Sequence, residues 1–248
     1  FWPGALTIIF PVRPDVPREV TSGLTTIGVR MPSHPIAFEL IRQARTPIAA
    51  PSANLSTKPS PTVGRHVIDD LNGRVECIID GGESDIGVES TVLMLGDVPT
   101  ILRPGGVTLE MLQTVLPSTR VYRPSTDLEM ERKPRAPGMK YRHYAPSAET
   151  YVVTGAKRAE RLSSLATSLL SSGKRVGAIV WSAEVPAGCV VVRISGGERQ
   201  LQHDLFRAMR DLDKETDAIL VEGVPELDEG LAVMNRAKKA AVRVIEAN

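Results

Sequence analysis

The sequence predicts an α/β protein, with a mixed sheet in its first half and a small doubly wound sheet in its second. Short apolar runs rich in β-branched residues recur along the chain, and amphipathic helical patterns alternate with them. A stretch rich in proline and charge separates the two halves. Because the chain has 248 residues, it is long enough for two domains of ordinary size, each with its own core.

The strands expected in the first half are short and separate, which favours a mixed rather than a purely parallel sheet. These strands are Leu6–Phe10, Thr26–Met31, Thr46–Ala50, Val75–Ile79, Gly87–Leu95 and Thr100–Leu102. The expected helices run from Ser33 or His34 to Gln43, from Pro61 to Leu71, and to Leu116 from a cap at Thr108.

The second half shows the strand and helix order of a small doubly wound unit. It has no GxGxxG motif after its first strand, so a dinucleotide site is not indicated. The expected strands are Tyr151–Val153, Arg175–Val180, Val190–Ile194 and Ala218–Val221, and the expected helices are Ala156–Ser171, Glu198–Lys214 and Leu231–Ala247.

Composition excludes several classes of protein. A formal net charge of +1 argues against a wholesale nucleic-acid binder but leaves room for local basic patches. Cys77 and Cys189 stand alone, which indicates neither a disulfide framework nor a zinc site and fits a reducing, cytoplasmic setting. No apolar run approaches the roughly 20 residues that span a bilayer. Because the chain begins at Phe1, we expect coding sequence upstream of it.

The loop Pro51–Thr62 is the first candidate for chemistry. In an extended backbone, residues two apart point the same way, so Ser52 and Asn54 would offer a hydroxyl and an amide to one ligand. Ser60 is expected to cap a helix that starts at Pro61, leaving the N–H of Thr62 aimed outward, where a phosphate would bind. The alternative is a surface turn, because serine and asparagine favour turns.

Two arginines at strand ends suit an anionic ligand. Arg103 precedes Pro-Gly at the end of a strand and could hold a phosphate or carboxylate in bidentate fashion. Arg30 stands in a similar position, and Thr26 lies four residues earlier on the same strand face. The alternative is that these are ordinary surface arginines.

Ser90 lies at the mouth of a strand and could be taken for a nucleophile. The residues around it lack the Gly-x-Ser-x-Gly elbow, and no motif with a partner histidine is evident. A ligand-binding hydroxyl or a satisfied strand serine is therefore favoured. The four histidines show no metal-ligand spacing, so no protein metal ligand is assigned.

The connecting stretch ends in a segment that is unusual for a tether. Lys140-Tyr-Arg-His-Tyr144 concentrates cations and aromatic rings, and Tyr141 and His143 would share one face if extended. The segment either folds over a ligand or docks between two domains.

Seven ordered motifs together resemble the YrdC/TsaC family, in its two-domain, long form of threonylcarbamoyl-AMP synthase. They are Phe1-Trp-Pro-Gly4, Pro51-Ser-Ala-Asn-Leu-Ser56, Asp80-Gly-Gly82, Gly87-Val-Glu-Ser-Thr-Val92, Arg103-Pro-Gly105, Ala136-Pro-Gly-Met-Lys-Tyr-Arg-His-Tyr-Ala-Pro146 and Gly230-Leu-Ala-Val-Met-Asn-Arg236. The resemblance implies a twisted, N-terminally incomplete YrdC-like catalytic domain over 1–117, a linker over 118–147 that reaches over the active site, and a Rossmann-like three-layer domain over 148–248.

The resemblance also implies a reaction, in which L-threonine, bicarbonate and ATP with Mg²⁺ give threonylcarbamoyladenylate and pyrophosphate. This is the first step of threonylcarbamoyladenosine formation on tRNA, so tRNA or double-stranded RNA and the downstream modification machinery are implied partners. Arg30 and Ser90 are expected to hold threonine. The nucleotide is expected to meet Thr26, Ser52, Asn54, Thr62, Arg103, Tyr141, Arg142 and His143.

One departure limits the resemblance. In the family a Lys-x-Arg motif that contacts the triphosphate precedes the Phe-Trp-Pro-Gly segment, and this chain begins at that segment. We therefore expect weak binding but no turnover by these residues alone, and some apolar surface of the first sheet to be exposed. The alternative function is a catalytically inactive RNA-binding or regulatory module.

Overall fold

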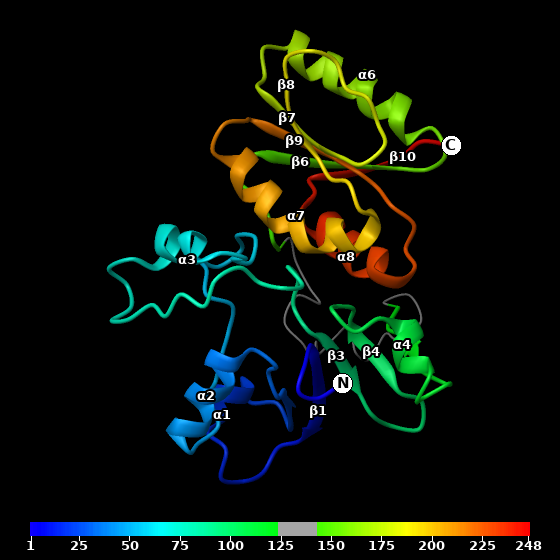
Figure 1. The fold of residues 1–248 in the computed structure, drawn as a ribbon. Coiled ribbons are helices and arrows are strands. Elements are labelled where there is room, and N and C mark those ends of the chain that lie inside the picture. The colour runs from blue at the N-terminus through cyan, green and yellow to red at the C-terminus, as the bar shows by residue number, and fades with distance from the viewer. Residues whose placement is uncertain (124–142) are drawn as a thin grey trace. The chain divides into compact units, whose positions relative to one another are not determined.

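The computed structural model describes residues 1–123 and 143–248, which form two compact units (Figure 1). Unit 1 comprises Phe1–Pro51 and Glu89–Tyr141, and unit 2 comprises Ser52–Val88 and Arg142–Asn248. The segment Ser52–Val88 therefore packs with the C-terminal part of the chain, although unit 1 flanks it in sequence on both sides. The domain bounds expected from the sequence remain predictions.

Unit 1 contains a five-stranded mixed sheet in the order β2-β1-β3-β4-β5. β1 pairs antiparallel with β2 and parallel with β3, while β3 and β4 are antiparallel and β4 and β5 are parallel. The mixed sheet predicted for the first half is confirmed. Its strands are β1 (Leu6–Pro11), β2 (Thr26–Val29), β3 (Thr91–Met94), β4 (Thr100–Arg103) and β5 (Arg120–Val121).

The core of unit 1 lies between this sheet and the short helix α4 (Leu109–Gln113). Thr108 caps α4, because its Oγ1 accepts a hydrogen bond from the amide of Met111 at 3.2 Å. The buried side chains of this cluster are Leu6, Leu93, Ile101, Val107 and Leu112.

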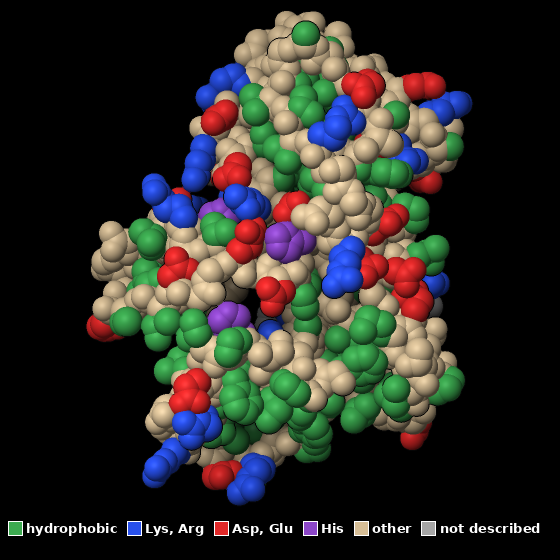
Figure 2. All heavy atoms as spheres, viewed as in Figure 1, with side chains coloured by type: hydrophobic (Ala, Val, Ile, Leu, Met, Phe, Trp, Pro, Cys, Tyr) green, Lys and Arg blue, Asp and Glu red, His purple; other side chains and the backbone are tan. Residues whose placement is uncertain are grey.

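The remaining helices of unit 1 are α1 (Arg18–Thr21) and α2 (Pro35–Ala44), and α2 buries none of its residues. Phe38 and Leu40 on α2 are 41% and 48% exposed, although the helix is amphipathic. Large apolar side chains are also exposed around β2, which lies at the sheet edge, and Figure 2 shows many hydrophobic side chains on this face of the protein. The exposed apolar surface expected on the first sheet is therefore present.

Unit 2 is a three-layer α/β fold around a five-stranded parallel sheet in the order β10-β6-β9-β7-β8. One cluster packs α6 against the sheet and a second packs α7 and α8, which confirms the three-layer prediction. The strands are β6 (Glu149–Thr154), β7 (Val176–Val180), β8 (Cys189–Arg193), β9 (Ala218–Glu222) and β10 (Arg243–Glu246). The helices are α3 (Gly64–Leu71), α6 (Arg158–Ser171), α7 (Gly197–Asp213) and α8 (Asp228–Ala240).

Three expectations for these elements are wrong. Residues 46–50 and 75–79 are not strands, since neither segment pairs with a strand among the described residues. Most of their side chains are exposed. The last helix ends at Ala240, and the chain continues as β10, which pairs in parallel with β6. Because a short apolar run fits a strand, a helix or a loop, periodicity alone could not separate these cases.

The carboxyl end of β9 holds a buried carboxylate. The Oε2 atom of Glu222 accepts hydrogen bonds from the amides of residues 181, 182 and 183 at 2.9, 2.9 and 2.8 Å. Arg158 on α6 places its Nε 3.4 Å from Oε1 of the same residue. Burial raises the pKa of Glu222, but the hydrogen bonds from Ser182 and the backbone outweigh it and keep the pKa below its ordinary value.

Neither a disulfide nor a membrane-spanning helix is found in the described part of the chain. Both cysteines are free, with Cys77 exposed and Cys189 partly buried. No helix there is long and apolar enough to cross a membrane.

Replacing Glu222 by glutamine should destabilise unit 2 by roughly 2–4 kcal/mol, because the neutral carboxamide would turn its NH2 group either toward buried backbone N–H groups or toward the guanidinium of Arg158. Urea unfolding monitored by circular dichroism measures the loss. Glu184→Gln is the control, since the side chain of Glu184 is 89% exposed and its ion pair with Arg193 lies at the surface. Equal losses in the two variants would contradict a structural role for the buried carboxylate.

Candidate functional site

In unit 1 the candidate site is centred on Ser90, which is 5% exposed and immediately precedes β3. Its Oγ lies 2.7 Å from Oγ1 of Thr7 on β1. Arg103, the last residue of β4, donates from Nη2 to the carbonyl oxygen of Ser90 at 3.0 Å and to its Oγ at 3.5 Å. The structure thus brings together two predicted residues, Ser90 and Arg103, and adds a hydroxyl that sequence reasoning missed.

The Arg-Pro-Gly motif has a steric basis. A Cβ atom on Gly105 would lie 2.2 Å from the carbonyl oxygen of Glu89 and 2.4 Å from the amide nitrogen of Thr91. Any other residue would push this loop away from Ser90. Gly105 therefore allows the backbone after Arg103 to pack directly on the backbone that carries Ser90.

Arg30 and Thr26 lie on a different strand, β2. Thr26 is its first residue, and Arg30 follows its last residue, as predicted. The Nε atom of Arg30 donates to the carbonyl oxygen of Gly4 at 2.9 Å, and its side chain is exposed. The strand-end position is confirmed, whereas a contact with threonine or nucleotide stays a prediction.

In unit 2 the candidate site is the loop that carries Ser52 and Asn54. The Nδ2 atom of Asn54 donates to the carbonyl oxygens of Leu55 and Lys58 at 2.8 and 3.3 Å. Its Oδ1 atom is buried and has no hydrogen-bond partner among the described residues. Since buried polar atoms are normally paired, this acceptor is suited to a ligand that brings a donor.

Thr62 is placed differently from the expectation. The helix begins at Gly64 rather than Pro61, and the amide of Thr62 donates to Nδ1 of buried His66 at 3.2 Å instead of pointing outward. A Cβ on Gly64 would lie 2.2 Å from Oδ2 of Asp80, so a carboxylate already covers this helix end. The expected helix start at Pro61 with a Ser60 cap is therefore wrong, whereas a contact between Thr62 and a nucleotide stays a prediction. The Oγ1 atom of Thr62 is buried and, within the described residues, unpartnered.

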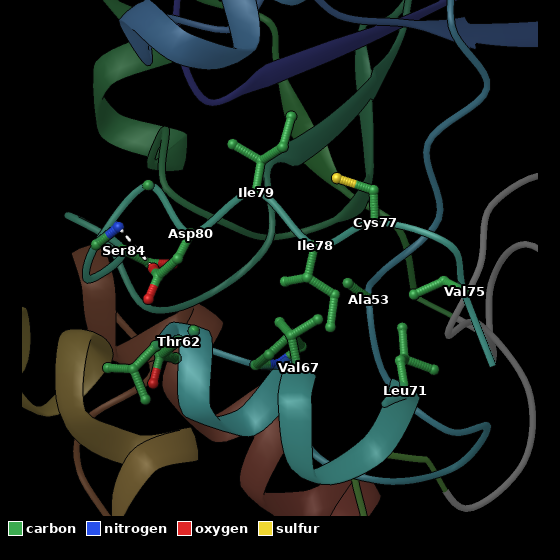
Figure 3. A pocket seen from close by; sticks show the side chains of 15 residues that line it. Ala53, Thr62, Val67, Leu71, Val75, Cys77, Ile78, Ile79, Asp80 and Ser84 are labelled. Carbon is green, nitrogen blue, oxygen red and sulfur yellow. Dashed lines mark hydrogen bonds between the residues drawn. The ribbon is translucent and has the colours of Figure 1, made fainter. Parts of the chain in front are cut away.

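A cavity of about 440 Å³ lies beside Thr62 within the segment Ser52–Val88 (Figure 3). Ala53 of the loop and Asp80 also line it, so the cavity meets both the loop and the start of α3. Apolar side chains form much of the remaining wall, namely Val67, Leu71, Val75, Ile78 and Ile79.

A buried ion pair holds this loop in place. Arg210 on α7 donates from Nη2 to Oδ2 of Asp70 on α3 at 2.7 Å, and Lys58 donates from Nζ to Oδ1 at 3.0 Å. Burial alone would raise the pKa of Asp70, but the hydrogen bonds from Arg210 and Lys58 outweigh it and lower the pKa.

The connecting segment is described only from His143 onward, so Tyr141 and Arg142 lie outside the described residues. The amide of His143 donates to the carbonyl oxygen of Lys239 at 3.1 Å, and its ring lies 4.2 Å from the ring of Tyr144. Tyr144 is 2% exposed and packs on Phe206 at 5.3 Å. This end of the segment is therefore docked on unit 2.

Sequence reasoning missed Thr7, Lys58, Asp70 and Arg210. Thr7 is the polar residue inside an apolar run, which is a weak signal. The other three are ordinary charged residues in loop or helix patterns, and their partners are distant in sequence, so no local pattern could have selected them.

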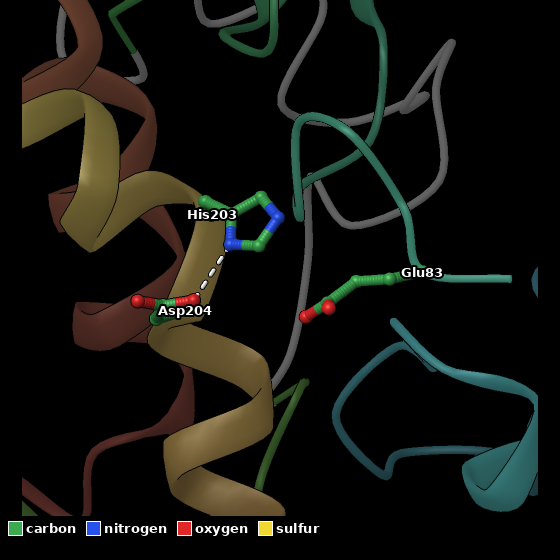
Figure 4. Close-up of side chains that lie close together, drawn as sticks. All are labelled: Glu83, His203 and Asp204. Carbon is green, nitrogen blue, oxygen red and sulfur yellow. Dashed lines mark hydrogen bonds and ion pairs between the residues drawn. The ribbon is translucent and has the colours of Figure 1, made fainter.

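Glu83, His203 and Asp204 place potential ligand atoms within 4.8 Å of one another (Figure 4). Arg207 donates to Glu83 at 2.7 Å, and Nδ1 of His203 lies 2.6 Å from Asp204. Mg²⁺ prefers oxygen ligands and keeps several waters. A group with an imidazole and a neighbouring guanidinium does not fit it.

The geometry defines an α/β protein with clustered hydroxyl and guanidinium groups beside Ser90 in unit 1 and unpartnered amide and hydroxyl oxygens on Asn54 and Thr62 in the described part of unit 2. Residues 1–105 match the family model described as "Telomere recombination", and residues 107–242 match "Threonylcarbamoyl-AMP synthase, C-terminal domain".

Similar proteins extend this match over nearly the whole chain. The threonylcarbamoyl-AMP synthases of Pyrococcus abyssi and Bacillus subtilis are each 47% identical over 97% of the chain, which covers 71% and 70% of their lengths. A crystal structure of P. abyssi Sua5 complexed with L-threonine is 46% identical, with a TM-score of 0.93, over 100% of this chain and 74% of that one. The chain belongs to the two-domain Sua5/YrdC family of threonylcarbamoyl-AMP synthases.

Replacing Thr62 by valine should leave the free energy of unfolding unchanged or raise it by up to about 1 kcal/mol. Valine has nearly the same shape and removes a buried hydroxyl that has no partner within the described residues. Thermal unfolding checks this, with Thr91→Val as control. The Oγ1 of Thr91 donates to the carbonyl oxygen of Val107, so that variant should lose stability. A loss at Thr62 as large as that at Thr91 would show that its hydroxyl is structural.

The contribution of Asp70 to stability should depend on pH. Because its folded pKa lies below its unfolded value, the contribution is present above about pH 4 and is lost as the pH falls through the folded pKa. The difference in unfolding free energy between wild type and Asp70→Asn should therefore shrink from pH 6 to pH 3, measured by urea unfolding. A difference that stays constant over this range would contradict the charged pairing of Asp70 with Arg210 and Lys58.

Proposed function

We propose that this chain serves in the synthesis of L-threonylcarbamoyladenylate from L-threonine, bicarbonate and ATP, with release of pyrophosphate. The observation that carries the proposal is its similarity, along its full length, to the P. abyssi Sua5 structure complexed with L-threonine. The matched relatives are named for the synthesis of the same product, threonylcarbamoyl-AMP.

The chemistry follows from positioning rather than from a covalent nucleophile. Threonine and bicarbonate first give a carbamate with loss of water. A carbamate oxygen then attacks the α-phosphorus of ATP, and pyrophosphate leaves. Among the described residues, the side chains bonded to the Ser90 hydroxyl are those of Thr7 and Arg103. Neither is a general base, so Ser90 is assigned to binding.

The proposed roles divide between anion-binding and hydrogen-bonding groups. Arg30 and Ser90 hold threonine, and Arg103 and Thr26 meet the nucleotide. A guanidinium such as Arg103 stabilises charge that develops on phosphate oxygens. Ser52, Asn54 and Thr62 are also proposed as nucleotide-binding residues, and one of Tyr141, Arg142 and His143 is proposed to cover the nucleotide.

Mg²⁺ is proposed to enter with ATP, where it would neutralise phosphate charge. The group of Glu83, His203 and Asp204 does not fit that ion. No protein ligand is assigned to it.

The proposed partners follow from the product. The adenylate supplies an activated threonylcarbamoyl group, so a transferase acting on tRNA must consume it, and a contact with tRNA or double-stranded RNA is proposed. The free thiols of Cys77 and Cys189 fit a cytoplasmic location.

Ligand binding by the chain tests the proposal. L-threonine should bind, and Ser90→Ala should weaken it by about 10- to 100-fold, the range expected for a hydrogen bond to a charged group. Asn54→Ala should weaken ATP binding by a similar factor while the protein stays folded. Isothermal titration calorimetry in bicarbonate and Mg²⁺ measures both affinities.

Turnover is measured as threonine-dependent release of pyrophosphate. Two proteins are compared, namely this chain and the same chain extended by those residues of the P. abyssi relative that lie outside the match. Absence of threonine binding together with salt-sensitive RNA affinity would favour the alternative, an inactive RNA-binding module.

A further inference from the structure

The loop that carries Asn54 is fastened to helix α7 by a buried guanidinium. Arg210 is 8% exposed and donates from Nε and Nη2 to the carbonyl oxygen of Pro59 at 3.0 and 2.6 Å. The same Nη2 donates to Oδ2 of Asp70 at 2.7 Å. One side chain of α7 therefore holds both the end of the loop and the carboxylate beneath it.

Asp70 extends this connection to the start of the loop. It is 3% exposed, its Oδ2 also accepts from the amide of Leu55 at 3.3 Å, and its Oδ1 accepts from Lys58 at 3.0 Å. The loop is thus held at residues 55, 58 and 59, directly beside Asn54.

These contacts determine how Asn54 presents its amide. Its Nδ2 donates to the carbonyl oxygens of Leu55 and Lys58, which are the same two residues that Asp70 holds. With both positions fixed, the carboxamide plane is fixed as well, and the buried Oδ1 is left without a partner in the described chain. Displacement of the loop would let Oδ1 turn to water or backbone.

We propose that Asp70 and Arg210 are positioning residues that orient Asn54 for its ligand, so that helix α7 of the C-terminal part controls the Ser-x-Asn loop. The role rests on the proposed function of Asn54 in nucleotide binding. Neither residue needs to touch the ligand, because each acts through the backbone of residues 55–59. A buried pair suits this task, since removing either partner leaves the other charge buried and uncompensated.

Hydrogen exchange of the Leu55 amide and of the Asn54 side-chain amide, measured by NMR, tests the positioning directly. Arg210→Ala should raise both exchange rates by at least about tenfold. Arg207→Ala is the matched control, since Arg207 is one turn away on α7 and makes an exposed ion pair with Glu83. A second pair compares Asp70→Asn with its neighbour Asp69→Asn, whose ion pairs are partly exposed.

Should Arg210→Ala fail to fold, Arg210→Lys takes its place, because it keeps the charge but replaces the planar fork, which bonds Pro59 through Nε and Nη2, by a single nitrogen. Exchange rates equal to those of the control variants would overturn the proposal.

A double-mutant cycle on ATP affinity then separates positioning from a purely structural role. Arg210→Ala should weaken ATP about as much as Asn54→Ala, and the double variant should be less than about twofold weaker than either single variant. Additive losses, or a loss only in Asn54→Ala, would overturn the positioning role.

A failure of the proposed nucleotide role of Asn54 would give a different set of results. If Asn54→Ala leaves ATP affinity unchanged, Asn54 has no nucleotide role and there is nothing for Arg210 to position. The exchange rates still show separately whether the pair holds the loop.

Discussion

The ion pair between Asp70 and Arg210 is the contact on which the arrangement of unit 2 depends. It joins helix α3 to helix α7, and it is almost completely removed from water. Buried ion pairs overcome the cost of desolvation only when additional hydrogen bonds satisfy both partners. Here the carboxylate also accepts from Lys58 and Leu55, and the guanidinium also reaches the carbonyl oxygen of Pro59.

In unit 2, two positions that normally attract ligands are occupied by carboxylates of the protein itself. In open α/β sheets, ligands usually bind outside the carboxyl ends of the strands. At the end of β9 that position holds Glu222, bonded to three successive amides, and at the start of α3 it holds Asp80. The polar atoms without a described partner are instead found on Asn54 and Thr62, which directs attention to the loop.

Much of the fold could be predicted from the sequence, because most strands and helices carry strong local patterns. The positions of Arg30 and Arg103 at strand ends, and the capping of α4 by Thr108, followed from neighbouring residues. The runs 46–50 and 75–79 were misassigned, since apolar composition does not reveal whether a strand partner exists.

The candidate site was predicted only in part. The Ser-x-Asn loop could be found from its own residues, whereas its support could not, because Asp70 and Arg210 are 140 positions apart. The bond between the Thr62 amide and His66 was missed for a related reason. The Nδ1 atom of His66, four residues after Thr62, accepts the hydrogen bond for which a serine cap was expected. Composition does not show which of these side chains will accept it.

The interleaving of the two units has a consequence for dissecting the protein. The two family models meet near residues 105–107, yet unit 2 takes in Ser52–Val88 from the first of them. A C-terminal piece cut at that border keeps Arg210 and leaves Asp70 and Pro59 behind. Such a piece would keep every strand of its own five-stranded sheet, but its Arg210 guanidinium would lose the carbonyl oxygen of Pro59 and the carboxylate of Asp70, so a cut at the border between the two modules removes the support of the Ser-x-Asn loop rather than the sheet.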